Sequence, residues 1–112
     1  MNYIPDRGHV VWMTFNPQVG HEQTGRRPAL VLSPARYNEK VGLAIFCPIT
    51  SHSKGYPFEV AIPPGLAAIG VILADQVKSL DWRIRKAEFF CVLPPETIQE
   101  TLLKLNTLIA PE

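Results

Sequence analysis

Ten residues near the N-terminus, VGHEQTGRRP, combine groups that can transfer a proton with groups that can bind an anion. The carboxylate of Glu22 can accept a proton, and the guanidinium of Arg27 can stabilise a phosphate or an oxyanion. His21 can act as an acid or a base near neutral pH. Charged loop residues are more often simply solvated, and an exposed Glu–Arg pair contributes little. Taken alone, the segment is weak evidence for acid–base chemistry.

Two later segments place polar groups just beyond apolar runs. Thr50 and Ser51 follow AIFCPI, where their hydroxyls could bond a phosphate oxygen. The alternative is ordinary turn chemistry, in which Ser and Thr bond their own backbone. Asp75, Gln76 and Lys78 follow GVIL in the same way. For these the alternative is a strand that runs out into solvent.

The charge balance argues against a strongly basic surface, because 11 Lys and Arg oppose 10 Asp and Glu and leave a net charge of +1. A local basic groove is compatible with that total, and single-strand binding needs no more. Trp82, beside Arg83, could stack a base, although a lone Trp more often belongs to a core or an interface. The basic residues that could line such a groove are Arg26, Lys54, Lys78, Arg83, Arg85 and Lys86.

The elements that must position these groups are short strands punctuated by 11 prolines and 7 glycines. A long loop is expected from Asn16 to Pro28, and a turn or single helical turn from Pro34 to Gly42. Pro48 indicates an edge or a bend in its strand. The strands are predicted at His9–Phe15, Ala29–Ser33, Leu43–Thr50, Phe58–Ile62, within GVILADQVKSL and at Phe89–Leu93.

The period changes after Pro94. Ile98, Leu102, Leu105 and Ile109 recur at helical spacing and predict an amphipathic helix, which Pro95 can begin. The chain of 112 residues is long enough for one domain, residues 1–112. We therefore expect a mostly β fold with a C-terminal helix, its antiparallel strands curled into a small barrel that hides their edges.

Cysteine and histidine usage does not predict a metal site. Cys47 and Cys91 lie in apolar runs and are expected to be buried thiols, and the three histidines are widely spaced. No apolar run is long enough to span a membrane, and the N-terminus lacks the pattern of a signal peptide. These features predict a cytoplasmic protein.

Three blocks of the sequence resemble the MazF/PemK toxin family and cover nearly the whole chain: GHEQTGRRPALVLSPARYNEKVG, PITSHSKGYPFEV and GVILADQVKSLDWRIRKAE. The SKGYPFEV run is similar to the chromosomal MazF type. The resemblance implies an SH3-like (PemK-like) barrel and a sequence-specific endoribonuclease that cuts single-stranded RNA without a metal or other cofactor. It also implies a homodimer and a cognate MazE-like antitoxin with a flexible acidic tail.

The same resemblance assigns roles to particular residues. Glu22 and Arg27 match the catalytic Glu and Arg of the family, and Thr50 matches its phosphate-contacting Thr. His21 and Asp75 match a His and an Asp of the plasmid branch, but that branch has an Arg where this chain has Leu73. His21 and Asp75 are therefore second candidates for catalysis. The residues expected to bind RNA are Arg26, Ser51, Lys54, Gln76, Lys78, Trp82, Arg83, Arg85 and Lys86.

Two other functions remain open on the sequence. One is a toxin of the same fold that poisons DNA gyrase by protein–protein contact, as CcdB-like proteins do. The other is a non-catalytic binding module on an SH3-like barrel. Neither has a use for Glu22, Arg27 and Thr50 together.

Overall fold

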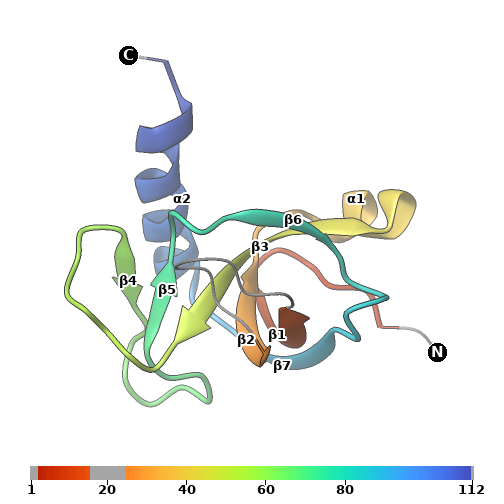
Figure 1. The fold of residues 1–112 in the computed structure, drawn as a ribbon, viewed down its shortest axis with the longest axis horizontal. Helices are drawn as coiled ribbons and strands as arrows, with labels where there is room; N and C mark the ends of the chain where they lie inside the picture. Colours follow the sequence, from red (N-terminus) through yellow and green to blue (C-terminus); the bar gives the residue numbers. More distant parts are fainter. Residues whose placement is uncertain (1–2, 16–24, 112) are drawn as a thin grey trace.

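The computed structural model describes residues 3–15 and 25–111. His21 and Glu22 lie outside the described residues. The elements are β1 (His9–Phe15), β2 (Gly25–Val31), α1 (Ala35–Val41), β3 (Leu43–Thr50), β4 (Glu59–Ala61), β5 (Val71–Leu73), β6 (Lys78–Asp81), β7 (Glu88–Val92) and α2 (Pro95–Ile109). Figure 1 shows the strands wrapped around one another, with α2 standing beside β4 and β5. The predicted fold, mostly β with a C-terminal helix, is confirmed.

The strands form one antiparallel sheet in the order β4-β5-β3-β2-β1-β7, and β6 pairs with β3 outside this path. The sheet curls as the predicted SH3-like barrel does. Among the described residues, no pairing joins its two end strands, β4 and β7, so hydrogen bonds do not close the barrel. Because the sheet curls, strands that are distant in sequence lie close together around its middle (Figure 1).

Several strands differ from the predicted bounds, and two of these differences bear on the site. β2 begins at Gly25 and not at Ala29, because residues 25–30 pair in register with β1. Arg26 and Arg27 therefore lie on a strand and not in a loop. The segment GVILADQVKSL forms two strands, β5 and β6, with a turn between them in which the Gln76 N–H donates to the Leu73 carbonyl at 3.1 Å.

Pro48 marks the bend of β3, the strand with the most neighbours. On one side it is paired with Ala29 of β2. On the other side β3 pairs with β6 through Phe46 and with β5 from Ile49 onward. Because proline has no N–H to donate, it fits the interval where β3 changes partner. The bend was correctly predicted, whereas placing Pro48 at a sheet edge was wrong.

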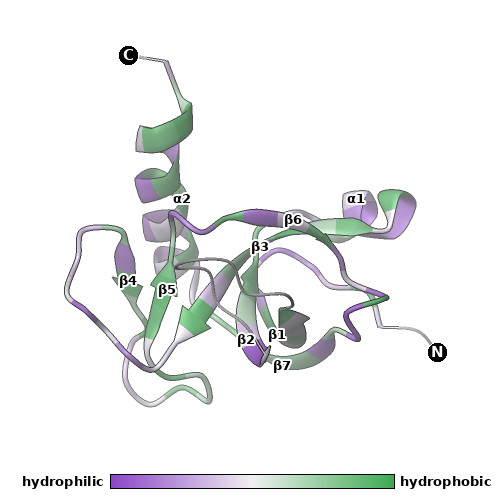
Figure 2. Cartoon of the chain, viewed as in Figure 1, coloured by the Kyte–Doolittle hydropathy of each residue, from purple (hydrophilic) through white to green (hydrophobic). Residues whose placement is uncertain are grey.

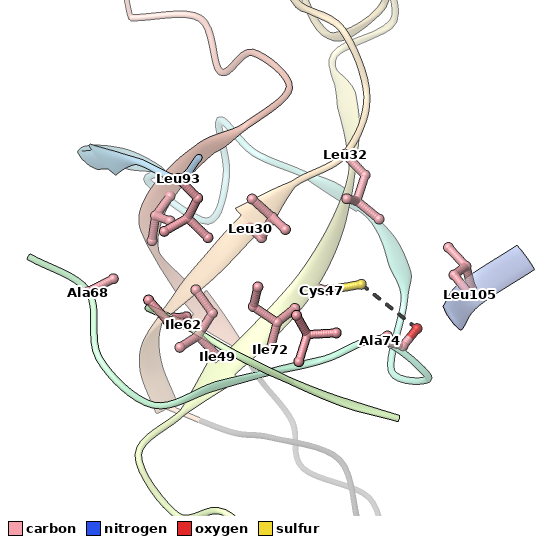
Figure 3. Packing of buried hydrophobic residues seen from close by; sticks show 12 residues of the cluster. Leu30, Leu32, Cys47, Ile49, Ile62, Ala68, Ile72, Ala74, Leu93 and Leu105 are labelled. Carbon is pink, nitrogen blue, oxygen red and sulfur yellow. Dashed lines mark hydrogen bonds between the residues drawn. The ribbon is translucent and has the colours of Figure 1, made fainter. Parts of the chain in front are cut away.

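The hydrophobic core has two clusters, one on each face of the curled sheet. Figure 3 shows the first, in which Leu30, Ile49, Ile72 and Leu93 meet beneath α2. Cys47 belongs to it, and burial raises the pKa of this thiol to about 12. The predicted buried thiol is thus confirmed for Cys47, while Cys91 is only partly buried.

The second cluster contains Val11, Met13, Phe46 and Trp82. Trp82 is 5% exposed, and its indole N–H donates to the Asn38 carbonyl at 3.0 Å. The Arg83 guanidinium lies 4.7 Å from the centre of the indole ring system. The prediction that Trp82 stacks a base is wrong in this structure, because the ring is packed in the core.

The helix α2 packs through Thr97, Thr101 and Leu105, which are buried, and through Ile98 and Leu102, which pack against the first cluster. The Thr101 hydroxyl donates to the Thr97 carbonyl at 2.9 Å, which satisfies it within the core.

The end of α2 extends past the sheet (Figure 1), and the apolar residues there remain uncovered (Figure 2). Ile109 is 69% exposed, so assigning it to the buried face was wrong. Leu103 and Leu108 are exposed beside it. Among the described residues, no helix is long and apolar enough to cross a membrane.

Gly70 provides a test of how tightly β5 approaches β3. A Cβ built at Gly70 would lie 2.1 Å from the Thr50 carbonyl oxygen, and its φ of +106° is one that L side chains rarely adopt. We expect Gly70→Ala to lower the free energy of unfolding by more than about 2 kcal/mol, because strain and a backbone clash add.

The matched control is Gly65→Ala, since Gly65 has a φ of +88° and open space around its Cβ. It should cost only about 1 kcal/mol, the conformational part. Urea unfolding followed by circular dichroism measures both values. If the two variants lost the same free energy of unfolding, the clash with the Thr50 carbonyl would not be what destabilises Gly70→Ala.

Candidate functional site

Arg27 is held by the pairing of β2 with β1, where it lies opposite Met13. It lines a cleft of about 530 Å³, here called the arginine cleft. The polar lining includes Ser51, which follows directly after β3. The remaining lining is Trp12, Gly25, Arg26, Pro28, Ile49, Ala67, Ala68, Ile69 and Phe90. The structure thus brings three of the predicted site residues, Arg26, Arg27 and Ser51, to one cleft.

The wall of the arginine cleft is aromatic, which the sequence analysis missed. Trp12 is 37% exposed, and its ring centre lies 5.3 Å from that of Phe90. Ile69 is exposed on the same cleft. The available signal was the alternation along β1, which buries Val11 and Met13 and so turns Trp12 to the other face.

A second hollow, the carboxylate pocket, has a volume of about 350 Å³. It brings together four predicted site residues that are up to 26 positions apart in sequence, namely Thr50, Lys54, Asp75 and Gln76. The pairing of β5 with both β3 and β4 joins these segments, since Thr50 pairs with Val71 and Glu59 pairs with Leu73. The pocket is completed by His52, Tyr56, Glu59 and Leu73.

Thr50 is 7% exposed, and its hydroxyl oxygen accepts a hydrogen bond from the His52 N–H at 3.1 Å. This is the turn hydrogen bond that was expected as the alternative to phosphate binding. A hydroxyl that accepts one bond still carries its own proton, so Thr50 can also donate to an anion. The two interpretations are therefore compatible.

Tyr56 and Asp75 form the shortest side-chain contact described in this pocket, with the Tyr56 hydroxyl donating to Asp75 Oδ1 at 2.6 Å. Burial raises the pKa of Tyr56 above its ordinary value, and the bond to the Asp75 carboxylate raises it further. At neutral pH Tyr56 is therefore a neutral donor, and one oxygen of Asp75 is engaged by it.

Glu59 is held on the floor of the same pocket by three donors. Its carboxylate accepts from the Lys54 N–H at 2.7 Å, the Ser53 hydroxyl at 2.7 Å and the Gly55 N–H at 3.0 Å. These bonds, the one from Lys54 foremost, hold the pKa of Glu59 below its ordinary value. The side chain is ionised at neutral pH and satisfied from within the protein.

Arg26 and Arg85 are engaged within the protein, and the RNA backbone contacts predicted for them stay predictions. The Arg26 guanidinium is paired with Glu88 and donates to the Lys86 carbonyl at 2.8 Å. Arg85 donates to the Thr14 carbonyl at 3.3 Å. Together these bonds fasten the turn between β6 and β7 to β1 and β2.

The other basic candidates are divided among different surfaces. Arg83 and Lys86 are exposed but line a third hollow with Tyr3, whose lining residues belong to neither the arginine cleft nor the carboxylate pocket. Lys78 is half-buried on β6 opposite Phe46. Of the predicted basic contacts, Lys54 is the one that is both exposed and on the carboxylate pocket.

His21 and Glu22 lie outside the described residues, so their predicted roles are not tested by the structure. The described residues that flank them, Phe15 and Gly25, are paired with each other. Gly25 lies two residues before Arg27 on β2.

A family model described as PemK-like, MazF-like toxin of type II toxin–antitoxin system matches residues 6–109. The chain belongs to this family. It is 50% identical over 107 residues to the endoribonuclease toxin MazF of Escherichia coli K12, with 96% of each chain covered. It is also 30% identical to the endoribonuclease PemK of Escherichia coli, over 93% of this chain and 81% of that one.

Solved structures of family members agree with the fold. MazF of Deinococcus radiodurans matches with a TM-score of 0.94 and 55% identity, covering 98% of this chain and all of that one. A MazE–MazF complex from the same organism matches with a TM-score of 0.89 and 54% identity, covering 99% and 100%. The family and the barrel predicted by resemblance are thus confirmed.

The Tyr56–Asp75 bond predicts a pH-dependent signal. Tyr56 should ionise above the ordinary tyrosine pKa, and Asp75→Asn should lower its pKa because the neighbouring negative charge is removed. The pKa should not fall to the ordinary value, since burial remains. Absorbance titration near 295 nm measures this, with Tyr56→Phe identifying the signal. An unchanged Tyr56 titration in Asp75→Asn would contradict the contact.

Proposed function

We propose that this family member is a sequence-specific endoribonuclease toxin that cuts single-stranded RNA by attack of the RNA's own 2′-hydroxyl. The observation that carries the proposal is the strand register around Ala29 and Pro48. Arg27, two residues before Ala29, and Thr50, two residues after Pro48, leave this antiparallel pair at the same end. An obligate cation and a hydroxyl donor are thereby available to one phosphate.

The chemistry assigns one role to each residue. Glu22, as general base, removes the proton from the 2′-hydroxyl, whose oxygen forms a bond to the adjacent phosphorus. Arg27 stabilises the charge of the phosphorane-like transition state, and Thr50 donates to a non-bridging oxygen. The bond to the 5′-oxygen then breaks, and that oxygen takes up a proton from solvent water, while Glu22 returns its proton to the solvent. The products are a 2′,3′-cyclic phosphate and a 5′-hydroxyl end.

Each of these roles has a typical magnitude. A positioned base contributes about 10²–10⁴-fold, and removal of one preorganised donor to a developing oxyanion costs about 10²–10³-fold. Arg27 acts electrostatically, because a guanidinium with a pKa above about 12 is a poor proton donor. His21 and Asp75 have supporting roles, since Leu73 occupies the position of their plasmid-branch partner Arg.

The two hollows supply contacts to bases and backbone. Trp12 and Phe90 offer apolar ring surface to a base next to the scissile phosphate, and base–aromatic stacking contributes about 1–3 kcal/mol. Lys54 offers a charge to the RNA backbone, and Gln76 and Asp75 offer polar atoms to a base edge. Trp12 thus offers an exposed ring for stacking, which the buried Trp82 does not.

The partners that we propose are a second copy of the chain and a MazE-like antitoxin with an acidic tail. The relatives from Deinococcus radiodurans include MazE–MazF complexes. The uncovered apolar end of α2, with Leu103, Leu108 and Ile109 exposed, is compatible with a subunit contact. Light scattering at micromolar concentration tests the dimer, and a monomer mass would exclude it.

Incubation of the pure protein with a long single-stranded RNA in EDTA separates the proposal from its rivals. Discrete fragments support the nuclease. Intact RNA would support a gyrase-poisoning toxin of the same fold or a non-catalytic module.

Arg27→Ala should reduce kcat/KM by about 10²-fold or more, because a donor to the transition state is lost. Glu22→Ala should act similarly, and His21→Ala should cost less. Circular dichroism should remain native, which separates loss of chemistry from loss of fold. A variant Arg27→Ala with near-wild-type cleavage would refute its assignment, and a loss for His21→Ala as large as that for Arg27→Ala would reverse the ranking.

A substrate with a single 2′-deoxy sugar just 5′ of the scissile phosphate should bind but stay uncut. It retains nearly all contacts but lacks the attacking oxygen. A metal-bound hydroxide would cut it, and EDTA would then stop the reaction. Gel analysis of the RNA and the deoxy substrate, each with and without EDTA, compares the two mechanisms. Cleavage of the deoxy substrate would exclude 2′-hydroxyl attack.

A further inference from the structure

The loop from Ser51 to Phe58, between β3 and β4, is organised by a single side chain. Three consecutive residues, Ser53, Lys54 and Gly55, donate to the carboxylate of Glu59, at distances of 2.7 to 3.0 Å. Both carboxylate oxygens are used. Residues 51–55 are all exposed and polar or glycine, so no buried apolar side chain fixes this part of the chain.

Glu59 is itself fixed from two other elements. As the first residue of β4 it pairs with Leu73 of β5. From α2, Lys104 Nζ donates to the Glu59 carbonyl at 2.8 Å. The residue is 9% exposed, so the carboxylate acts on the loop from a rigid, largely buried position.

The loop carries the polar rim of the carboxylate pocket. Thr50 precedes it, and His52, Lys54 and Tyr56 belong to it. A carboxylate in a pocket that receives RNA would ordinarily repel phosphate. At Glu59 three hydrogen-bond donors of the protein compensate the charge, which leaves the carboxylate an organising role rather than a contact with RNA.

We propose that Glu59 is a positioning residue that presets the loop 51–58, so that His52, Lys54 and Tyr56 face the substrate before it binds. This inference rests on the proposed function, because the substrate is the RNA. A loop that is already ordered loses less conformational entropy on binding. Without the carboxylate, the loop must be ordered by the RNA itself, and the cost appears mainly in KM.

The test variant is Glu59→Gln in the full chain. Its amide oxygen can still accept from Ser53 and Gly55, but its NH₂ group faces the Lys54 N–H, so two donors oppose each other. The matched control is Glu100→Gln, which removes the same charge from an exposed residue near Lys104. Ser53→Ala is a milder second variant, because it deletes one bond without a change of charge.

Two measurements separate positioning from a purely structural role. In Glu59→Gln, hydrogen exchange at the Lys54 and Gly55 amides should accelerate about tenfold or more, while amides of β3 and α2 keep their protection. In cleavage assays, KM should rise about tenfold and kcat should change by less than about threefold, because Arg27 lies on another strand. Ser53→Ala should show both effects in the same direction but smaller, and Glu100→Gln neither.

The outcomes distinguish this inference from the proposed function. If the wild-type protein leaves RNA intact, the proposed function fails and the inference with it. If the wild type cleaves but Glu59→Gln matches Glu100→Gln in KM, only the positioning role is overturned. Unchanged exchange at Lys54 and Gly55 would also overturn it. Should Glu59→Gln fail to fold, Ser53→Ala decides, since wild-type exchange and KM in that variant would refute the role.

Discussion

The structure depends on the pairing of β3 with strands on both of its sides. Its first half lies between β2 and β6, and its end lies beside β5, with Pro48 at the change of partner. A strand that pairs with different partners along its length has to bend. A residue without an N–H can occupy the bend because it leaves no hydrogen-bond donor unpaired. This one constraint curls the sheet and brings Thr50 and Ser51 out at the end where Arg27 lies.

The opposite end of β3 is secured by a buried polar network in addition to its apolar contacts. Asn38, fully buried, accepts from the Ser33 hydroxyl at 2.6 Å and donates to the Pro5 carbonyl at 2.9 Å. The Ser33 hydroxyl oxygen also accepts from the Ile45 N–H, and the Trp82 indole donates to the Asn38 carbonyl. Because each of these polar groups has a hydrogen-bond partner, burying the network costs little free energy and favours one packing arrangement. It explains why Trp82 belongs to the framework and not to the binding surface.

The two hollows of the molecule differ in the groups that line them. The arginine cleft joins a cation to aromatic surface, which suits a phosphate flanked by bases. The carboxylate pocket joins donors and acceptors whose positions are set by Glu59 and by the Tyr56–Asp75 bond. The Arg26 and Arg85 side chains fasten a turn instead of adding charge to the surface, which agrees with a net charge of only +1.

The sequence by itself determined the family through its resemblance, and the β-rich class and the C-terminal helix through local patterns. The β-rich class and the helix can be predicted from local patterns, since hydrophobic periodicity and proline placement act over a few residues. Only the tertiary structure decided that Arg26 is engaged, that Trp82 is buried and that Trp12 and Glu59 line the hollows. Such outcomes depend on which strands pair and which face turns inward, and a shift of one residue exchanges the faces of a strand. The role of Glu22, in segment 16–24, stays a prediction from the sequence. A motif can identify the residue, but its burial and bonding partners are properties of the fold.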